Sequence, residues 1–283
     1  RIAHERQHLQ EVQEKRQLDE EEQELLEKLL TCTPELFEQF SNDVERAKKI
    51  LRSQAFYDID QLEWATNCLH QTMTLISLGY YPAQICFPPI ETDIVYKPFM
   101  SSEIIESLDD DQINIYRDVY AMLIRPVMER DRPAMVGISV VQQKQLIPTF
   151  TFCKMIKEEF PATHITLGGN IITRIRDMLP GMENLWELFD SAIVYEGESA
   201  YLKLTEAVKN GDDFSSLPNL IYKDEEGVHV NKEVFAESLA ELPPPDFDGL
   251  PLEKYFVPQL ILPYLATRGC YWGKCTFCDH FQG

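Results

Sequence analysis

The second half of the chain alternates between two hydrophobic patterns. From residue 80 onward, short apolar runs are separated by stretches in which apolar residues recur every three or four positions. The apolar runs predict strands at 83–87, 135–141, 164–167 and 192–195, and the periodic stretches predict helices at 101–129, 148–160, 174–189 and 199–209. Such alternation is typical of βαβ units, so we expect an α/β fold with a doubly wound parallel sheet. Ligands of these sheets bind at the carboxyl ends of the strands.

The first 80 residues carry a different pattern, with apolar positions at helical spacing inside strongly charged surroundings. They predict helices over about 1–30, 34–51 and 62–76, and Thr33 and Pro34 provide a cap and a first-turn proline for the second. Residues 220–223 and 228–230 predict a hairpin, and the prolines after Leu242 predict a stiff, extended linker. The expected organisation is therefore a helical segment at 1–80, a Rossmann-like domain at 81–240, a Pro-rich linker at 241–262 and a further segment at 263–283.

Composition narrows the possible functions. The chain has 47 acidic and 26 basic residues and a formal net charge of −21, which argues against nucleic acid or an anionic membrane as a partner. No apolar run reaches about 18 residues, and the N-terminus lacks a signal-peptide pattern. Seven cysteines, an odd number, fit a reducing, cytoplasmic location. Since the sequence does not begin with Met and stops five residues after Cys278, we expect it to be the N-terminal part of a longer enzyme.

Three of the seven cysteines are clustered near the C-terminus. Cys270, Cys275 and Cys278 have the spacing C-x4-C-x2-C, and thiolates this close in sequence can converge on one soft metal centre. Gly269 and Gly273 would let the backbone turn tightly and direct N–H groups at the sulfur atoms. Residues 263–267 predict a short strand, so the cysteines are expected in a loop at a strand end.

The same residues allow zinc instead of an iron–sulfur cluster. Cys270, Cys275 and Cys278 with His280 could form a Cys3His zinc site. The chain would then be a non-catalytic interaction protein, with its long acidic N-terminal helix available for a partner. Composition and spacing leave this alternative open.

Small or polar residues follow three of the predicted strands of the sheet. They are Ser139-Val140-Val141, Gly168-Gly169-Asn170 and Glu196-Gly197-Glu198. Small residues at successive strand ends let a flat or bulky ligand approach the backbone. Because any doubly wound sheet uses glycine in its turns, the positions alone do not choose between a binding site and ordinary turns.

The string Arg268-Gly-Cys-Tyr-Trp-Gly-Lys-Cys-Thr-Phe-Cys278 resembles the cluster-binding loop of the radical SAM superfamily. The usual spacing there is C-x3-C-x2-C, so this loop has one extra residue, while Phe277 matches the aromatic residue often found before the last cysteine. The resemblance implies that Cys270, Cys275 and Cys278 hold a [4Fe–4S] cluster. It also implies that S-adenosylmethionine binds the fourth iron and is cleaved to a radical.

Residues 93–170 resemble the cobalamin-binding domains of methionine synthase and mutases. Ser139-Val140-Val141 stands for the SxL motif, and 26 residues separate it from Gly168-Gly169. The DxHxxG motif falls on Asp93 to Pro98, with Val95 in place of the histidine that binds cobalt. By this resemblance, cobalamin contacts come from Asp93, Val95, Ser139, Val141, Gly168, Gly169, Asn170, Glu196 and Gly197.

A cobalamin domain followed by a radical SAM loop resembles the cobalamin-dependent radical SAM enzymes. Gln145-Leu-Ile-Pro148, Leu167-Gly-Gly169, Glu196-Gly-Glu198 and Pro244-Pro-Asp246 have counterparts there in the same order. The resemblance implies a methyltransferase that acts on an unactivated carbon of a small-molecule or peptide substrate. It also implies the start of a radical SAM barrel at 263–283 and an electron donor such as flavodoxin or ferredoxin. A radical SAM enzyme whose upstream domain has lost cobalamin and only docks partners is the alternative.

Overall fold

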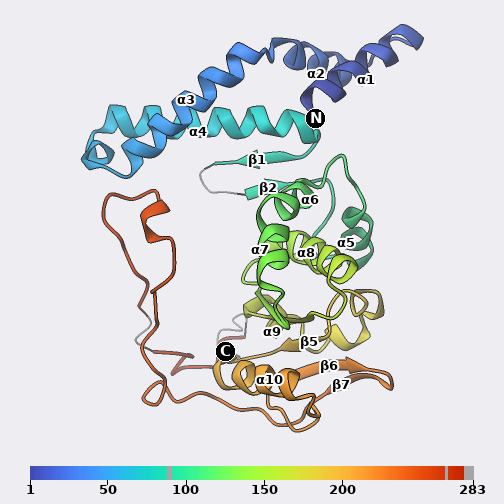
Figure 1. The fold of residues 1–283 in the computed structure, drawn as a ribbon, viewed down its shortest axis with the longest axis vertical. Helices are drawn as coiled ribbons and strands as arrows, with labels where there is room; N and C mark the ends of the chain where they lie inside the picture. Colours follow the sequence, from blue (N-terminus) through green and yellow to red (C-terminus); the bar gives the residue numbers. More distant parts are fainter. Residues whose placement is uncertain (88–90, 265–266, 277–283) are drawn as a thin grey trace. The chain divides into compact units, whose positions relative to one another are not determined.

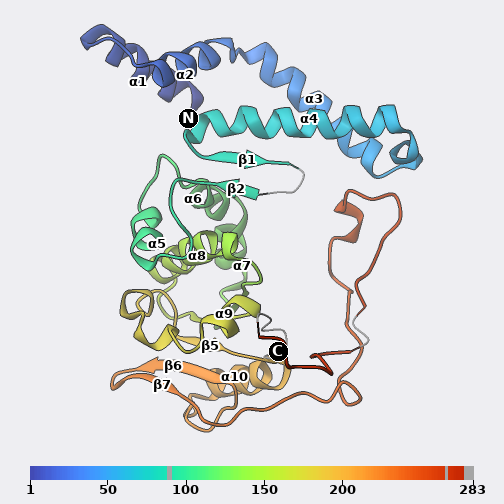
Figure 2. The ribbon, with the colours of Figure 1, turned by 180° about the vertical axis from the view of Figure 1, so that it is seen from behind.

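The structure is a computed structural model that describes residues 1–87, 91–264 and 267–276. Its chain trace divides into two compact units (Figures 1 and 2). Unit 1 comprises residues 1–95, 112–114 and 246–263, and unit 2 comprises the remainder. No helix in the described ranges has the length and apolarity needed to cross a membrane.

Unit 1 is mainly helical. Its elements are α1 (Ile2–Lys15), α2 (Glu20–Thr31), α3 (Pro34–Leu51), α4 (Ile59–Ser77), β1 (Gln84–Cys86) and β2 (Glu91–Asp93). The predicted first helix is therefore two helices, because Asp19 forms a capping box with Glu22 and starts α2 inside the predicted span. The predicted cap at Thr33 is confirmed, since its hydroxyl accepts a hydrogen bond from the Leu36 backbone N–H at 3.3 Å.

A segment from late in the chain belongs to unit 1. The guanidinium of Arg52 donates to the backbone oxygen of Lys254 at 2.7 Å, and the Phe87 and Phe256 rings meet edge to face at 6.5 Å. These contacts join the end of α3 and the strand region of unit 1 to residues 254–256. The segment that the sequence predicted as part of a linker is thus tied to a packed surface of unit 1 at this point.

Unit 2 carries the main sheet. In chain order its longer elements are α5 (Ser101–Leu108), α6 (Ile115–Val119), α7 (Arg125–Asp131), β3 (Met135–Ser139), α8 (Leu146–Glu159), β4 (His164–Gly168), α9 (Asn170–Ile175), β5 (Ser191–Ile193), α10 (Glu198–Asn210), β6 (Leu220–Asp224) and β7 (Gly227–Val230). The strand order is β3-β4-β5-β6-β7. Strands β3, β4 and β5 run parallel, whereas β6 and β7 are antiparallel to their neighbours.

The α/β class is confirmed, but the sheet is mixed and not wholly parallel. The predicted hairpin is confirmed as β6 and β7, and it continues the sheet beyond β5. The predicted strand at 83–87 was wrongly assigned to this sheet, because β1 pairs antiparallel with β2 in a separate two-stranded sheet of unit 1. Since β2 follows β1 after only four residues, the connection is too short for a parallel crossover. The Rossmann-like topology remains a prediction.

Two predicted helices are shorter than expected, and the described residues of one predicted strand are irregular. The helix predicted at 101–129 is interrupted between α5 and α6, and it contains a π-helical turn at Tyr120–Ile124. Of the helix predicted at 174–189, only its first two residues are helical, at the end of α9, and short 3-10 turns follow. The described part of 263–267 has no regular secondary structure, and the described residues form no closed barrel.

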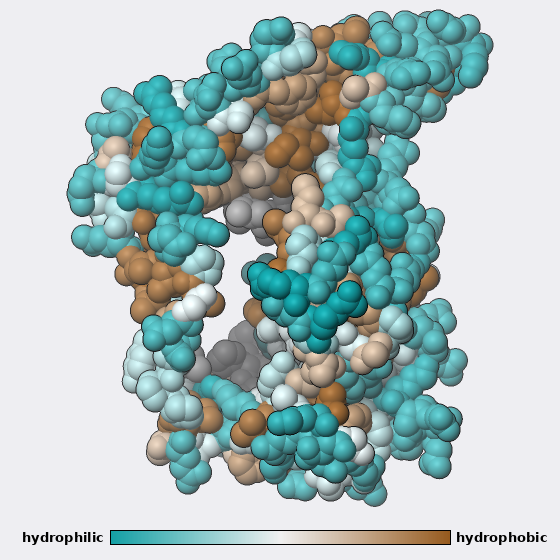
Figure 3. All heavy atoms as spheres, viewed as in Figure 1, coloured by the Kyte–Doolittle hydropathy of each residue, from teal (hydrophilic) through white to brown (hydrophobic). Residues whose placement is uncertain are grey.

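Helices cover the sheet of unit 2 on two sides. In Figures 1 and 2, α10 lies on one side of β5, and α8 with α9 lies on the other. The α10 side is closed by an apolar cluster that includes Ile193, Leu204 and Leu220, with Met135 at its margin. On the face drawn in Figure 3, hydrophilic side chains cover most of the helices, as the acidic composition leads one to expect.

Candidate functional site

A cavity of about 490 Å³ opens at the carboxyl ends of the three parallel strands. Strand register explains why it forms. Gly137 is paired with Thr166 and Ser139 with Gly168, so four small residues form two adjacent rows on one face of β3 and β4. The larger side chains that α10 packs against belong mainly to β5 and β6. The face over β3 and β4 is therefore left hollow by the lack of large side chains.

Aromatic side chains border the cavity. Tyr201, in the second turn of α10, lies so close to Gly137 that a Cβ atom there would come within 2.7 Å of the Tyr201 ring. Tyr195 follows β5 with a positive φ of 64°, an uncommon conformation for a bulky residue, and its N–H donates to the Thr173 hydroxyl at 2.8 Å. Both rings line the cavity, and both offer an apolar surface to a bound group.

The hydroxyl of Thr166 is the most informative atom in the cavity wall. Thr166 is only 2% exposed, and no hydrogen-bond partner for its Oγ1 exists among the residues that the structure describes. A buried polar group that lacks a partner costs free energy, so proteins seldom leave one without a functional reason. Thr166 lines the cavity, but its Oγ1 is itself shielded from solvent, so a bound ligand would reach this hydroxyl only after a shift of the atoms that cover it.

The turn after β4 is shaped by Gly169. Its φ of +96° and its contacts both require glycine, because a Cβ atom there would lie 2.6 Å from the Val140 oxygen and 3.0 Å from the Ser139 hydroxyl. Val140 in turn donates to the Gly168 oxygen at 2.7 Å and accepts from Ile171 at 3.0 Å. The turns after β3 and β4 are thus fitted together, which keeps the rim of the cavity free of side chains.

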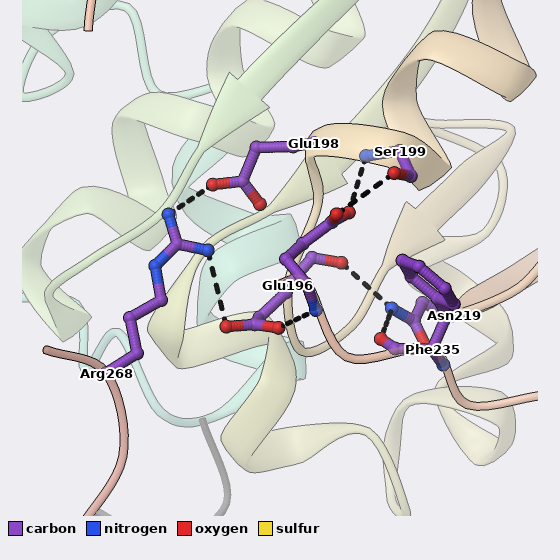
Figure 4. Close-up of polar contacts among 7 residues, drawn as sticks. Glu196, Glu198, Ser199, Asn219, Phe235 and Arg268 are labelled. Atoms are coloured by element: carbon purple, nitrogen blue, oxygen red, sulfur yellow. Dashed lines mark hydrogen bonds and ion pairs between the residues drawn. The ribbon is translucent and has the colours of Figure 1, made fainter. Parts of the chain in front are cut away.

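The turn after β5 ends in two carboxylates that share one cation. Arg268 donates to Glu196 Oε1 at 3.3 Å and, through its other terminal nitrogen, to Glu198 (Figure 4). The hydrogen bond from Arg268 holds the pKa of Glu198 below its usual value. Glu198 lines the cavity, and Arg268 lies two residues before Cys270. This ion pair joins the cysteine loop to the cavity wall.

The same turn is braced by two other segments of unit 2. Asn219 donates from Nδ2 to the backbone oxygens of Glu196 at 2.9 Å and Phe235 at 2.7 Å, and its Oδ1 accepts from Phe235 N–H at 2.9 Å. The Glu237 carboxylate accepts from the N–H of Ser199 at 2.7 Å and from its hydroxyl at 3.0 Å (Figure 4). The carboxylates that bind Arg268 therefore sit on a turn with fixed backbone geometry.

The described part of the cysteine loop, residues 267–276, is exposed and irregular. Gly269 and Gly273 adopt φ values of 75° and 56°. The backbone N–H groups of Gly273 and Trp272 near the thiol of Cys270 lower its pKa from the usual 9.0. Cys270 is exposed and Cys275 is partly buried. The predicted role of Gly269 and Gly273 in directing N–H groups at the sulfur atoms stays a prediction.

The third predicted ligand and the zinc alternative cannot be placed. Cys278 and His280 lie outside the described residues. Within the described residues, no three His, Cys, Asp or Glu side chains are arranged to hold a metal ion. The assignment of Cys270, Cys275 and Cys278 to one metal centre therefore remains a prediction.

The cavity brings together four of the predicted cobalamin contacts: Ser139, Gly168, Gly169 and Gly197. Val141, Asn170 and Glu196 lie nearby in the chain but outside its lining. Asp93 and Val95 belong to unit 1, so their predicted roles stay predictions, and Val95 is 63% exposed.

Sequence analysis missed five lining residues that matter here: Gly137, Thr166, Tyr195, Glu198 as a wall residue, and Tyr201. The alternation of side chains along β3 and β4 is the signal that could have found two of them. Gly137 and Thr166 each lie two residues before a predicted contact, and therefore on the same face of the strand. Arg268 gave no comparable signal, because its partners lie about seventy residues earlier in the chain.

Comparison with known proteins gives distant similarities. No family model matches the chain. An uncharacterized methyltransferase of Pyrococcus horikoshii is 24% identical over 158 residues, which cover 55% of this chain and 33% of that protein. The chain thus spans about a third of the length of the curated relative that it matches.

Two solved structures of the radical S-adenosylmethionine methyltransferase TsrM from Kitasatospora setae also resemble the chain. One contains tryptophan and an analogue of S-adenosylmethionine, with a TM-score of 0.34 and 16% identity over 48% of this chain. The other contains cobalamin and a [4Fe–4S] cluster, with a TM-score of 0.33 and 18% identity over 50% of this chain. Each match covers 27% of the TsrM chain.

Proposed function

We propose that this chain is part of a cobalamin-dependent radical SAM methyltransferase, and that unit 2 holds cobalamin beside a [4Fe–4S] cluster. One observation carries the proposal. A hollow at the carboxyl ends of three parallel strands is joined, through Glu198 and Arg268, to a loop with clustered cysteines. The similarity to a protein named as a methyltransferase supports the reaction class.

The cavity fits the nucleotide tail of cobalamin in size and chemistry. Its volume of about 490 Å³ falls within the range of about 300–1,000 Å³ that small-molecule pockets occupy. Gly168 and Gly169 would let the tail pass between the strand ends, and Ser139 and Thr166 would offer hydroxyl groups to it. The tyrosine rings at the border would exclude water and pack against its flat base.

The cysteine loop fits a cluster in donor type and in electrostatics. N–H groups near the Cys270 thiol stabilise a thiolate, which is the form that binds iron. Cys270, Cys275 and Cys278 would hold the cluster, and S-adenosylmethionine would complete it. When bound, the cluster supplies the electron that cleaves S-adenosylmethionine, and the corrin supplies a methyl group to an unactivated carbon. This chain's own residues bind, orient and shield the two groups.

Partners follow from the same proposal. The reaction needs an electron donor such as flavodoxin or ferredoxin and a small-molecule or peptide substrate. Both remain predictions. So does the further radical SAM barrel that would contain most of the contacts to S-adenosylmethionine.

Anaerobic reconstitution of the full chain with iron and sulfide tests the cluster. We expect a brown protein that absorbs near about 400 nm, with iron and sulfide in stoichiometric amounts. A colourless protein that retains one tightly bound zinc ion would reject the cluster and favour the Cys3His alternative.

Hydroxocobalamin binding tests the cavity. We expect the red colour to stay with the protein through gel filtration. Thr166→Val keeps the shape of the side chain and removes a hydroxyl for which the described residues supply no partner; weaker cobalamin binding, by up to about tenfold, would show that the bound ligand reaches it. The same change should stabilise the ligand-free protein by about 1–3 kcal/mol, since a buried unsatisfied group is removed. Loss of colour from the wild-type protein would favour a docking domain without cobalamin.

A further inference from the structure

The ion pair of Arg268 differs from an ordinary surface ion pair in its burial and in its number of partners. The Arg268 side chain is 28% exposed, and the side chains of its partners are 14% exposed for Glu196 and 40% exposed for Glu198. Exposed pairs contribute little because water and salt screen them, and because two mobile side chains must be ordered. Here one cation is held by two carboxylates from a single turn, and one of those carboxylates is largely buried.

The turn is also held by contacts that do not involve Arg268. Glu196 also accepts a hydrogen bond from the Glu237 backbone N–H, and the Glu237 side chain holds the first turn of α10 through Ser199 (Figure 4). Asn219 is 2% exposed and fixes the backbone oxygen of Glu196. None of these contacts involves Arg268, so they fix the turn independently of it. The acceptor side of the ion pair is therefore preorganised.

The ion pair lies close to the first cysteine of the cysteine loop. Arg268 and Cys270 are two residues apart, so their Cα atoms can be no more than about 7 Å from each other. Glu198 belongs to the wall of the cavity. If Cys270 moved away from the cavity by more than the short backbone between Arg268 and Cys270 allows, the ion pair would break.

We propose that Arg268 is a positioning residue that docks the cysteine loop on the cavity rim and fixes the distance between the metal centre and the cavity ligand. The inference rests on the proposed function for the identity of those two groups. The docking itself rests only on residues of unit 2. The proposal also gives Glu196 a supporting role, since its carboxylate accepts hydrogen bonds from Arg268 and from the Glu237 backbone N–H.

Docking is tested first in the metal-free full chain by hydrogen–deuterium exchange. Arg268→Gln should speed exchange of amides 267–276 severalfold and leave β3 and β4 unchanged. Glu198→Gln should also speed exchange, but less, because Arg268 keeps Glu196 as a partner, and the double variant should exchange no faster than Arg268→Gln, which already removes the contact to Glu198. Arg130→Gln is the matched control, since it removes an exposed cation of unit 2 that pairs with its neighbour Asp131. Unchanged exchange in Arg268→Gln would overturn the inference.

The distance is tested by electron paramagnetic resonance on protein reconstituted with iron, sulfide and hydroxocobalamin and then reduced. In the wild type, the paramagnetic cluster should speed the relaxation of the cob(II)alamin signal severalfold. Arg268→Gln should lose this effect at equal iron and cobalt content, and Arg268→Lys should restore part of it. If Arg268 had only a structural role, Arg268→Gln would change the amount of cofactor bound. The faster relaxation of the cob(II)alamin signal, compared at equal cofactor content, would then stay unchanged, and that result would reject the positioning role.

The two proposals can fail separately. If the wild type binds no cluster or no cobalamin, the proposed function fails, and exchange in the metal-free chain still decides whether Arg268 docks the loop. If both cofactors bind and Arg268→Gln matches the wild type in exchange and relaxation, the proposed function stands and the positioning role is wrong.

Discussion

The cavity wall and the cysteine loop are parts of one unit that are held in different ways. The wall is made by packed strands: Ile165, Leu167 and Ala192 are fully buried beside it. The loop from 267 to 276 has no regular secondary structure, and its Tyr271 and Trp272 side chains are exposed. The ion pair of Arg268 links the loop to the wall.

Thiol chemistry shows the same contrast. Burial raises the pKa of the Cys68 and Cys153 thiols, whereas backbone N–H groups lower that of Cys270. A thiol with a raised pKa stays protonated and is a poor metal ligand, and a thiol with a lowered pKa is a good one. Packing therefore prepares the cavity, and local backbone geometry prepares the loop. The predictions below test whether this division is real.

The largest expected effect is the loss of the metal centre in Cys275→Ala. If Cys275 is a ligand, the brown species near about 400 nm should disappear entirely after anaerobic reconstitution. Cys86→Ala is the matched control, because it removes a partly buried thiol from β1 in unit 1. Full iron binding by Cys275→Ala would remove this residue from the metal site, and equal loss in both variants would show that the effect is not specific.

Thiol labelling should separate the two regions in the metal-free protein. Because the pKa of Cys270 is lowered from 9.0, a larger fraction is thiolate at a given pH, and its reaction with iodoacetamide should have a pH midpoint below 9.0. Cys68 and Cys153 should stay unlabelled until the protein unfolds. Mass spectrometry of the labelled peptides measures each rate. Labelling of Cys153 as fast as Cys270 would contradict the described packing of α8.

Two neighbouring glycines provide a sharp test of the cavity rim. Gly169→Ala should destabilise the protein by about 1–3 kcal/mol, because its φ is positive and a Cβ atom would contact Val140 at 2.6 Å. Gly168→Ala meets nothing closer than 3.7 Å and should change stability by no more than about 0.5 kcal/mol. Urea unfolding of both variants compares them. Similar losses of stability would mean that the turn after β4 is not built as described.

Because Gly168→Ala should leave stability nearly unchanged, it can test hydroxocobalamin binding separately from folding. Its methyl group would enter the cavity from the wall, so hydroxocobalamin should bind more weakly although the protein is stable. Unchanged binding would place the ligand elsewhere on the molecule.

The smallest expected effect is the pH dependence of loop docking. Arg268 holds the pKa of Glu198 below 4.5, so the folded value lies below the unfolded one. The contact therefore favours docking above pH 4.5 and is lost as the pH falls through the lowered value. The 19F signal of fluorotryptophan at Trp272 should shift in this acid range, with Trp64 and Trp186 as internal references. Glu198→Gln should remove the shift, and a shift that persists in this variant would assign it to another group.

Local patterns in the sequence determined much of the architecture. The cap at Thr33 with Pro34, the strands at β3, β4 and β5, and the hairpin of β6 and β7 were all predicted, because period and turn residues act within a few positions. The three cysteines and the glycine-rich strand ends were identified for the same reason. The first of the predicted strands was assigned to the wrong sheet, because the apolar run at 83–87 does not determine which strand it pairs with.

Tertiary structure alone decided which side chains meet. Strand register places Gly137 beside Thr166, and the packing of α10 brings Tyr201 over Gly137. Arg268 reaches Glu198 only because the chain returns to unit 2 after a long excursion. The spacing of hydrophobic residues depends on neighbours along the chain. A cation shared by two carboxylates, or a buried hydroxyl that lacks a partner among the described residues, depends instead on residues far away in sequence. For that reason the sequence predicted the strand ends and the cysteines as candidates, and only the folded chain revealed how the cavity and the cysteine loop are held together.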